Sequence, residues 1–254
     1  MLLADPPPSQ GDLHFRVLGI PVRVHPWFWG ISLLMGMGLG SKRADPVNTL
    51  IWVVVVFVSI LVHELGHAFL QRFYGGRPRI TLYGMGGLAI CDDCDRSPRS
   101  QILISLAGPM AGFLLAALVV AVLAATGHFR GFRFDLWPID RTFYDPIEIL
   151  QDNTVKFSPR DTMINDLLWV NIFWGLVNLL PVYPLDGGRV SREVLTISQP
   201  RRGIVQSLWL SIAAAGAVAV FGVIVLQSIF MAVFFGYLAY ANYQTLQAYE
   251  QHWQ

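Results

Sequence analysis

The residues best suited to chemistry are His63-Glu64-Leu65-Gly66-His67, an HExxH pattern. Residues four positions apart share one face of an α-helix, so both imidazoles can bind one metal ion. Glu64 follows the first histidine directly and can reach a water molecule on that metal. The alternative is a surface helix with solvated polar groups, because so short a pattern recurs in many unrelated proteins.

The surroundings of the motif weigh against a solvated surface helix. It follows an apolar run over residues 50–62, which places its ionisable groups within or at the rim of a membrane helix. Each charge there costs about 2.5–3.5 kcal/mol on insertion scales, so such a cluster needs compensation. A zinc ion compensates it by accepting imidazoles and a carboxylate and leaving one position for water. The position therefore favours a metal site over structural histidines.

A catalytic zinc site needs a further protein ligand, since such sites normally take three. Asp186 is the best candidate, in the run NLLPVYPLDGGR at 178–189 that ends the fourth apolar segment. Pro181 and Pro184 break or kink that helix and free backbone groups near the metal. The alternative for Asp186 is an Asp-Gly turn that merely ends a helix.

The composition indicates that a bilayer solvates much of the chain. Hydrophobic residues make up 54% of it and charged residues 14%, against about 25% charged residues in soluble domains. The net charge of +1 gives no argument for nucleic-acid binding, and none is expected. We predict an all-α polytopic membrane protein with a small membrane-associated β-hairpin and about six transmembrane helices, near 26–40, 49–70, 101–125, 164–184, 207–227 and 228–246.

The distribution of arginine predicts which connections between the membrane helices face the cytoplasm. The connections at 71–100 and 187–206 are rich in arginine and should be cytoplasmic, whereas acidic residues outweigh basic ones at about 126–163, which should be extracytoplasmic. With six helices, both termini are then cytoplasmic. The expected organisation is an N-terminal tail and interfacial segment at 1–25, a six-helix domain at 26–246 and a cytoplasmic tail at 247–254.

Glycines and β-favouring residues alternate near 78–92, which predicts a hairpin or loop that re-enters the membrane. Non-helical backbone at that depth must lie against protein or a wet cavity. The alternative is an ordinary interfacial loop.

Cys91 and Cys94 follow in the sequence CDDC; two cysteines exclude a disulfide framework and favour a reduced pair in a solvated cytoplasmic loop. A second metal or redox site there lacks a matching CxxC or a nearby histidine.

Several motifs, in this order, resemble the site-2 protease family of intramembrane zinc metalloproteases. HELGH at 63–67, SLAGPMAG at 105–112 and NLLPVYPLDGGR at 178–189 carry the resemblance. It extends to GIPVRVHPWF at 19–28 and to LYGMGGLA at 82–89, where the family has its re-entrant hairpin. The resemblance covers essentially the whole chain. The length to residue 254 leaves no room for the PDZ or CBS modules of many relatives, so a compact form is expected.

The resemblance implies the roles of the site residues. His63, His67 and Asp186 would hold one zinc ion per chain, and Glu64 would act as general base. Asn178 matches an asparagine thought to position the substrate or steady the oxyanion. The implied function is regulated intramembrane proteolysis, in a bacterial-type cytoplasmic membrane, of transmembrane substrates such as membrane-tethered transcription regulators. The sequence indicates no oligomeric state.

Two other functions remain compatible with these residues. A membrane metallohydrolase acting on a lipid-like substrate could use the same activated water, but the hairpin suits an extended peptide better. A non-catalytic membrane scaffold could retain the fold. The presence of Glu64 argues against it, because a structural zinc site needs no general base.

Overall fold

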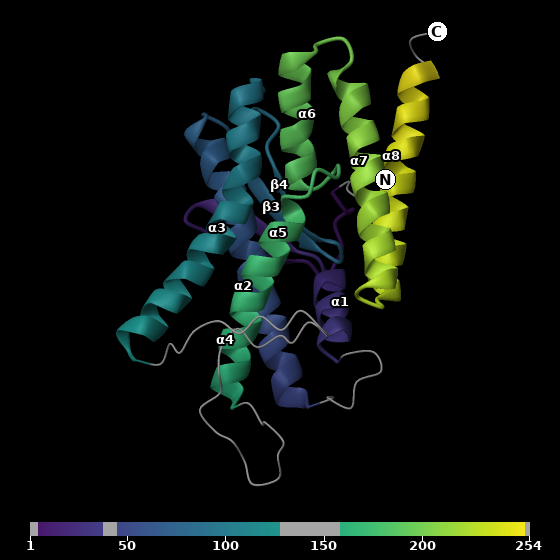
Figure 1. Ribbon diagram of the computed structural model, residues 1–254. Helices are drawn as coiled ribbons and strands as arrows, with labels where there is room; N and C mark the ends of the chain where they lie inside the picture. Colours follow the sequence, from purple (N-terminus) through teal and green to yellow (C-terminus); the bar gives the residue numbers. More distant parts are fainter. Residues whose placement is uncertain (1–4, 38–44, 128–157, 252–254) are drawn as a thin grey trace. The chain divides into compact units, whose positions relative to one another are not determined.

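The computed structural model describes residues 5–37, 45–127 and 158–251, which are mainly helical with one small sheet (Figure 1). The described chain divides into two compact units. The first comprises residues up to Cys94 together with Met110–Gly175, and the second comprises Asp95–Pro109 and the residues from Leu176 onward. Most of the extracytoplasmic connection expected at 126–163 lies outside the described residues.

The first unit contains a sheet that is larger than expected. Its strands β1 (Leu13–Val17), β2 (Ile20–Val24), β3 (Arg79–Tyr83) and β4 (Gly86–Ile90) lie in the order β1-β2-β3-β4. β1 and β2 are antiparallel, β2 and β3 parallel, and β3 and β4 antiparallel. The expectation of an all-α protein with a single hairpin is therefore wrong in one respect. β3 and β4 form that hairpin, but the segment before residue 25 adds two more strands to it.

The helices of the first unit begin at clear sequence signals. α1 (Pro26–Gly36) and α2 (Pro46–Phe73) each start with proline after a side-chain cap, from His25 and Asp45 respectively. Ser158 caps α4 (Pro159–Trp169), which continues through the π-helical turn η1 (Val170–Trp174) into α5 (Gly175–Asn178). The core of this unit joins the inner face of the sheet to α1 and α2, through residues such as Val24, Phe28, Ile60 and Leu82.

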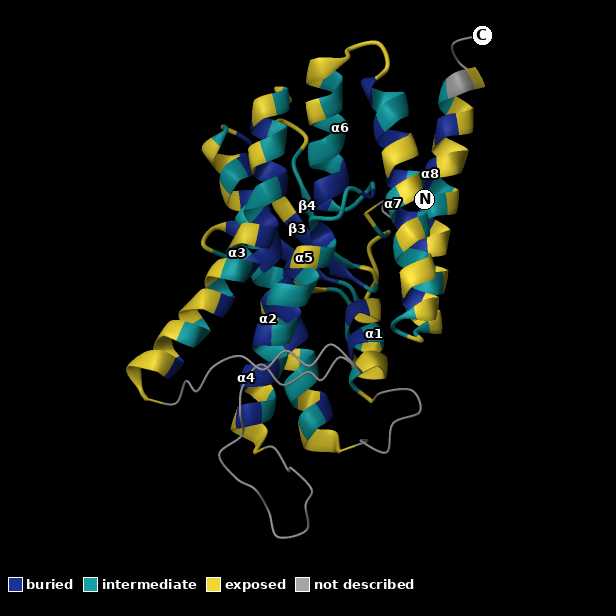
Figure 2. Ribbon diagram, viewed as in Figure 1, coloured by how far each residue is buried: buried dark blue, intermediate teal, exposed yellow. Residues whose placement is uncertain are grey.

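The helix α3 (Pro98–Ala125) belongs to both units, which divide at its internal Pro109. Its later half lies in the first unit, where Ala116 and Leu123 form a small core with Ile164 and Leu168 of α4. Many of its other side chains are exposed (Figure 2).

The second unit contains α6 (Asp186–Ser198), α7 (Gly203–Ile224) and α8 (Ile229–Gln251). Its core forms where Val182, in the irregular stretch before α6, packs with Ala215 of α7 and with Phe235 and Leu238 of α8. The sequence was expected to form a loop at 187–206, and α6 corrects this expectation. Two glycines follow Asp186 and disfavour a helix by propensity, but the backbone packing described below requires them.

Three helices among the described residues are long and apolar enough to cross a bilayer, namely α2, α3 and α7. They identify an integral membrane protein. The expected number of about six spans is not confirmed, because α1 has only 11 residues and the other described helices lack the length or apolar run of these three.

Candidate metal centre

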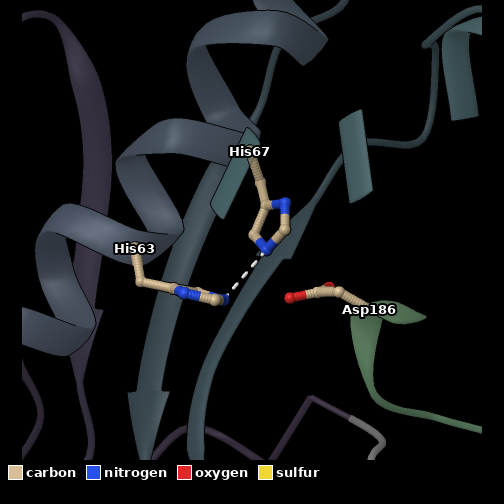
Figure 3. Close-up of side chains that lie close together, drawn as sticks. All are labelled: His63, His67 and Asp186. Atoms are coloured by element: carbon tan, nitrogen blue, oxygen red, sulfur yellow. Dashed lines mark hydrogen bonds between the residues drawn. The ribbon is translucent and has the colours of Figure 1, made fainter. Parts of the chain in front are cut away.

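The helix α2 carries a stripe of buried polar side chains. His63, Glu64 and His67 are each less than a tenth exposed. The two histidines turn their rings toward one another (Figure 3), and their Nε2 atoms are 3.2 Å apart. Two nitrogens bound to one tetrahedral zinc ion at about 2.0–2.1 Å would be roughly 3.3–3.4 Å apart. The two imidazoles are therefore spaced as ligands of a single ion.

Glu64 lies directly against the edge strand β4. A Cβ atom built on Gly87 would lie 2.3 Å from Cγ, 2.5 Å from Oε1 and 2.6 Å from Cδ of Glu64. Any residue larger than glycine at position 87 would therefore displace the carboxyl group of Glu64. Gly87 belongs to the run LYGMGGLA at 82–89, for which only a hairpin was predicted. A glycine inside a strand is a signal of close approach by another group, and that signal could have pointed to it.

Hydrogen bonds hold the histidine-bearing face of α2 both before and after the motif. One turn before His63, Ser59 Oγ accepts a hydrogen bond of 2.9 Å from Nδ2 of Asn171, which lies in η1. One turn after His67, Nε2 of Gln71 donates to the carbonyl oxygen of Ala89 in β4 at 3.3 Å. Short π-helical turns are frequent at functional sites. The polar stripe is thus attached to two neighbouring elements of its own unit.

The cysteines differ from the sequence expectation. Cys91 and Cys94 form a disulfide, so the expected reduced pair is wrong. The disulfide packs against the chain just after α2, because a Cβ atom on Gly76 would come within 2.2 Å and 2.4 Å of the two sulfur atoms. Asp93 lies beside the sulfurs and completes a cluster with metal-binding residue types. In the disulfide state the sulfurs offer no thiolate, which is the form of cysteine that binds metal.

The remaining candidate residues belong to the second unit. Asn178 is the last residue of α5, and Asp186 is the first residue of α6; both are buried. Figure 3 draws the side chain of Asp186. The backbone packs tightly around Asp186. A Cβ atom on Gly187 would lie 2.1 Å from the carbonyl oxygen of Leu179, and one on Gly188 would lie 2.3 Å from the backbone nitrogen of Tyr183. These two glycines let α6 begin against the preceding irregular stretch.

Comparison with known proteins adds an independent finding. Residues 51–220 match the model of peptidase family M50, and this range includes the HExxH motif and Asp186. A zinc metalloprotease of Methanocaldococcus jannaschii is 27% identical over 72% of this chain and 44% of its own length. The stage IV sporulation protein FB of Bacillus subtilis is 27% identical over 67% of this chain and 46% of its own length. The chain thus spans less than half the length of these relatives.

The fold is shared with a solved structure. The site-2 protease from Methanocaldococcus jannaschii matches with a TM-score of 0.58 and 22% identity, over 92% of this chain and 95% of that one. At this identity the likeness concerns the fold. The family model covers more than half of the chain, and on that ground the chain belongs to peptidase family M50.

Proposed function

We propose that this chain is a zinc-dependent intramembrane endopeptidase that hydrolyses peptide bonds within or near the transmembrane segments of membrane proteins. The observation that carries the proposal is the spacing of 3.2 Å between the imidazole nitrogens of His63 and His67, beside the buried Glu64. Family membership and the apolar character of α2 support it.

The donor set suits one zinc ion per chain. His63 and His67 would supply two nitrogen ligands, and we assign the third ligand to the carboxylate of Asp186. Two histidines and one carboxylate are a known set for catalytic zinc. The relative from Methanocaldococcus jannaschii is itself named a zinc metalloprotease. When bound, zinc would polarise the scissile carbonyl group and lower the pKa of a water molecule toward 7.

The protein groups then have separate tasks in the hydrolysis. Glu64 takes the proton from the attacking water and passes it to the leaving amine. Its burial beside the backbone of Gly87 restricts where its carboxyl group can lie. Asn178 is proposed to donate its side-chain amide to the oxyanion or to the substrate backbone. Such donors are worth most where water is excluded.

The substrate must present an extended segment, because a helical carbonyl group is already engaged in a hydrogen bond. β4 lies at the edge of the described sheet, and its Gly87 touches Glu64. Strand addition at such an edge supplies backbone hydrogen bonds to an extended peptide. We propose that the unwound part of the substrate pairs with β4. Membrane-tethered transcription regulators are one class of suitable substrate.

The proposed membrane arrangement has about six spans, the hairpin β3–β4 re-entering the bilayer and both termini in the cytoplasm. Its support is the arginine content of the segments at 71–100 and 187–206. These segments would face the cytoplasm under the positive-inside rule.

The test is cleavage of single-span model proteins by the purified chain in liposomes, with the cut sites mapped by mass spectrometry. We expect cuts within or beside the apolar span, loss of cleavage after a chelator removes the metal, and recovery when zinc is added back. A soluble peptide with the same cut sequence serves as a control for the need to unwind a helix. Zinc-dependent release of fatty acid without cleavage of either substrate would instead establish a lipid hydrolase.

A further inference from the structure

The irregular stretch between α5 and α6 is held by two buried polar side chains from other helices. The backbone N–H of Tyr183 donates to Ser211 Oγ of α7 at 2.9 Å. The carbonyl oxygen of the same residue accepts from Asn242 Nδ2 of α8 at 2.6 Å. Tyr183 precedes Asp186 by three residues, and all four residues lie in the second unit.

Both side chains are enclosed by protein. Ser211 is 0% exposed and Asn242 is 2% exposed. Asn242 also donates to the carbonyl oxygen of Leu238 in its own helix, whereas its Oδ1 atom is buried without a hydrogen-bond partner among the described residues. A buried acceptor left unpaired costs about 1–3 kcal/mol. Asn242 therefore keeps its hydrogen bond to Tyr183 although its own acceptor stays unpaired.

A short and tightly packed segment connects Tyr183 to Asp186, so the hydrogen bonds to Tyr183 also restrict the position of Asp186. The backbone N–H of Leu185 bonds to the carbonyl oxygen of Val182 at 2.8 Å and closes the turn before Asp186. Val182 is fully buried between α7 and α8. Gly188 then packs its backbone against Val182 and Tyr183. Movement of Tyr183 therefore displaces the first turn of α6 and, with it, the carboxylate of Asp186.

We propose that Ser211 and Asn242 are positioning residues for the metal centre, which fix the backbone of Tyr183 and thereby the direction of the Asp186 carboxylate. The inference rests on the proposed function, in which Asp186 is the third zinc ligand. It assigns the two C-terminal helices α7 and α8 a part in metal binding. Neither residue touches the substrate or the reacting atoms in this scheme.

The test measures the zinc dissociation constant of the full chain in detergent, by competition with a chelator, beside the melting temperature and the kinetics of cleavage. Ser211→Ala removes the acceptor, and Asn242→Leu removes the donor at similar volume. Outer residues that orient metal ligands typically contribute about 10–100-fold in metal affinity. We expect each variant to weaken zinc binding by such a factor and to lower kcat more than it raises KM.

Two variants separate positioning from general stability. Ser211→Thr keeps the hydroxyl group and should retain the zinc affinity of the wild type. Ser207→Ala, one turn earlier on α7, removes another buried hydroxyl, whose one hydrogen bond within the described residues is to Ile204 of its own helix. We expect it to leave zinc affinity unchanged even if the melting temperature falls. Zinc affinities of Ser211→Ala and Asn242→Leu within twofold of the wild type would overturn the proposal.

Asp186→Ala distinguishes the failure of this proposal from the failure of the proposed function. If Asp186→Ala weakens zinc binding while Ser211→Ala and Asn242→Leu do not, only the positioning role is wrong. If Asp186→Ala binds zinc as tightly as the wild type, the ligand assignment is wrong and the positioning role fails with it. If Asn242→Leu does not fold, the comparison of Ser211→Ala with Ser211→Thr and Ser207→Ala decides the matter.

Discussion

The helices α2 and α3 are alike by length and hydropathy but differ in what they bury. Each has 28 residues, with mean hydropathies of 2.2 and 2.4 over their most apolar windows. In α2, 44% of that window is buried, against 28% in α3. α2 hides polar groups along much of its length, ending with His63, Glu64, His67 and Gln71, whereas the buried polar groups of α3 are serines near its start.

The difference shows what hydropathy does and does not reveal. Both helices satisfy the length and apolar content that a bilayer requires. Ionisable groups within such a helix are costly and mark function by default. We therefore expect the buried face of α2, rather than its hydropathy, to carry the chemistry, and we expect the exposed leucines of α3 to face lipid.

The largest effect is expected from removing a metal ligand of α2. His67→Ala should weaken zinc binding by roughly 10²–10⁴-fold, since one ligand of three or four carries a proportionate share of the about 10–16 kcal/mol typical of structural zinc sites. Chelator competition measures it. The matched variant in α3 is Ser105→Ala, which also removes a buried polar group. Equal zinc affinity in the two variants would contradict the assignment of the metal to α2.

The next largest effect concerns the contact of β4 with α2. Gly87→Ala places a methyl group on the flexible end of Glu64, so the side chain should move while the fold persists. We expect kcat to fall by about 10–100-fold, because a misplacement of about 1 Å can cost a factor of 10². Zinc affinity should stay within a few-fold of the wild type.

The control for that substitution is Gly84→Ala in the same hairpin. Its added methyl group would meet Ile31 and Trp27 at 3.2–3.5 Å. It should therefore leave kcat nearly unchanged. A loss of kcat as large as that of Gly87→Ala would show that the hairpin as a whole, rather than Glu64, responds to the extra methyl group.

A smaller effect is expected at Ser59. Ser59→Ala removes the hydrogen bond from Asn171 and should lower the free energy of unfolding in detergent by about 0.6 kcal/mol, the average for such bonds between membrane helices, with a maximum of about 1.7 kcal/mol. Thr126→Val, directly after α3, removes a hydroxyl whose hydrogen bonds, as far as the chain is described, are all to the preceding helical turn. Titration with a denaturing detergent compares the two. A greater loss of unfolding free energy for Thr126→Val than for Ser59→Ala would show that the hydrogen bond between Ser59 and Asn171 does not stabilise α2 more than a bond within one helix does.

The smallest effect is expected on the exposed side of α3. Leu118 is 60% exposed, so Leu118→Ala removes few contacts with other protein side chains. Its free energy of unfolding should stay within about 0.5 kcal/mol of the wild type. Its zinc affinity should not change. A loss of several kcal/mol would mean that this side of α3 packs against protein, for instance in an oligomer.

The parts of the structure that the sequence predicted are those with long or regular patterns. The HExxH motif and the apolar run before it predicted both the helix α2 and the shared face of its histidines. β1 and β2 were missed because they join the sheet through the pairing of β2 with β3, in which Val22 lies opposite Ile80, far along the chain. α6 was missed because Gly187 and Gly188 have low helix propensity, and their reason is a backbone approach that spacing does not reveal.

Contacts between distant residues account for the remaining gaps. Gly87 lies 23 positions after Glu64, and Ser211 and Asn242 lie 28 and 59 positions after Tyr183. The disulfide of Cys91 and Cys94, by contrast, joins residues three positions apart and depends on local geometry rather than on the number of cysteines. The sequence pointed to candidate residues for the chemistry, but it did not show what holds them in place.

The most direct test of the central claim compares the wild type with Glu64→Gln, both loaded with zinc, on one single-span substrate in liposomes. Metal content is determined for both proteins by elemental analysis. We expect one zinc ion per chain in each protein and cleavage only by the wild type, because we assign Glu64 to proton transfer and not to metal binding. Undiminished cleavage by zinc-loaded Glu64→Gln would contradict the claim that the buried face of α2 carries the catalytic base.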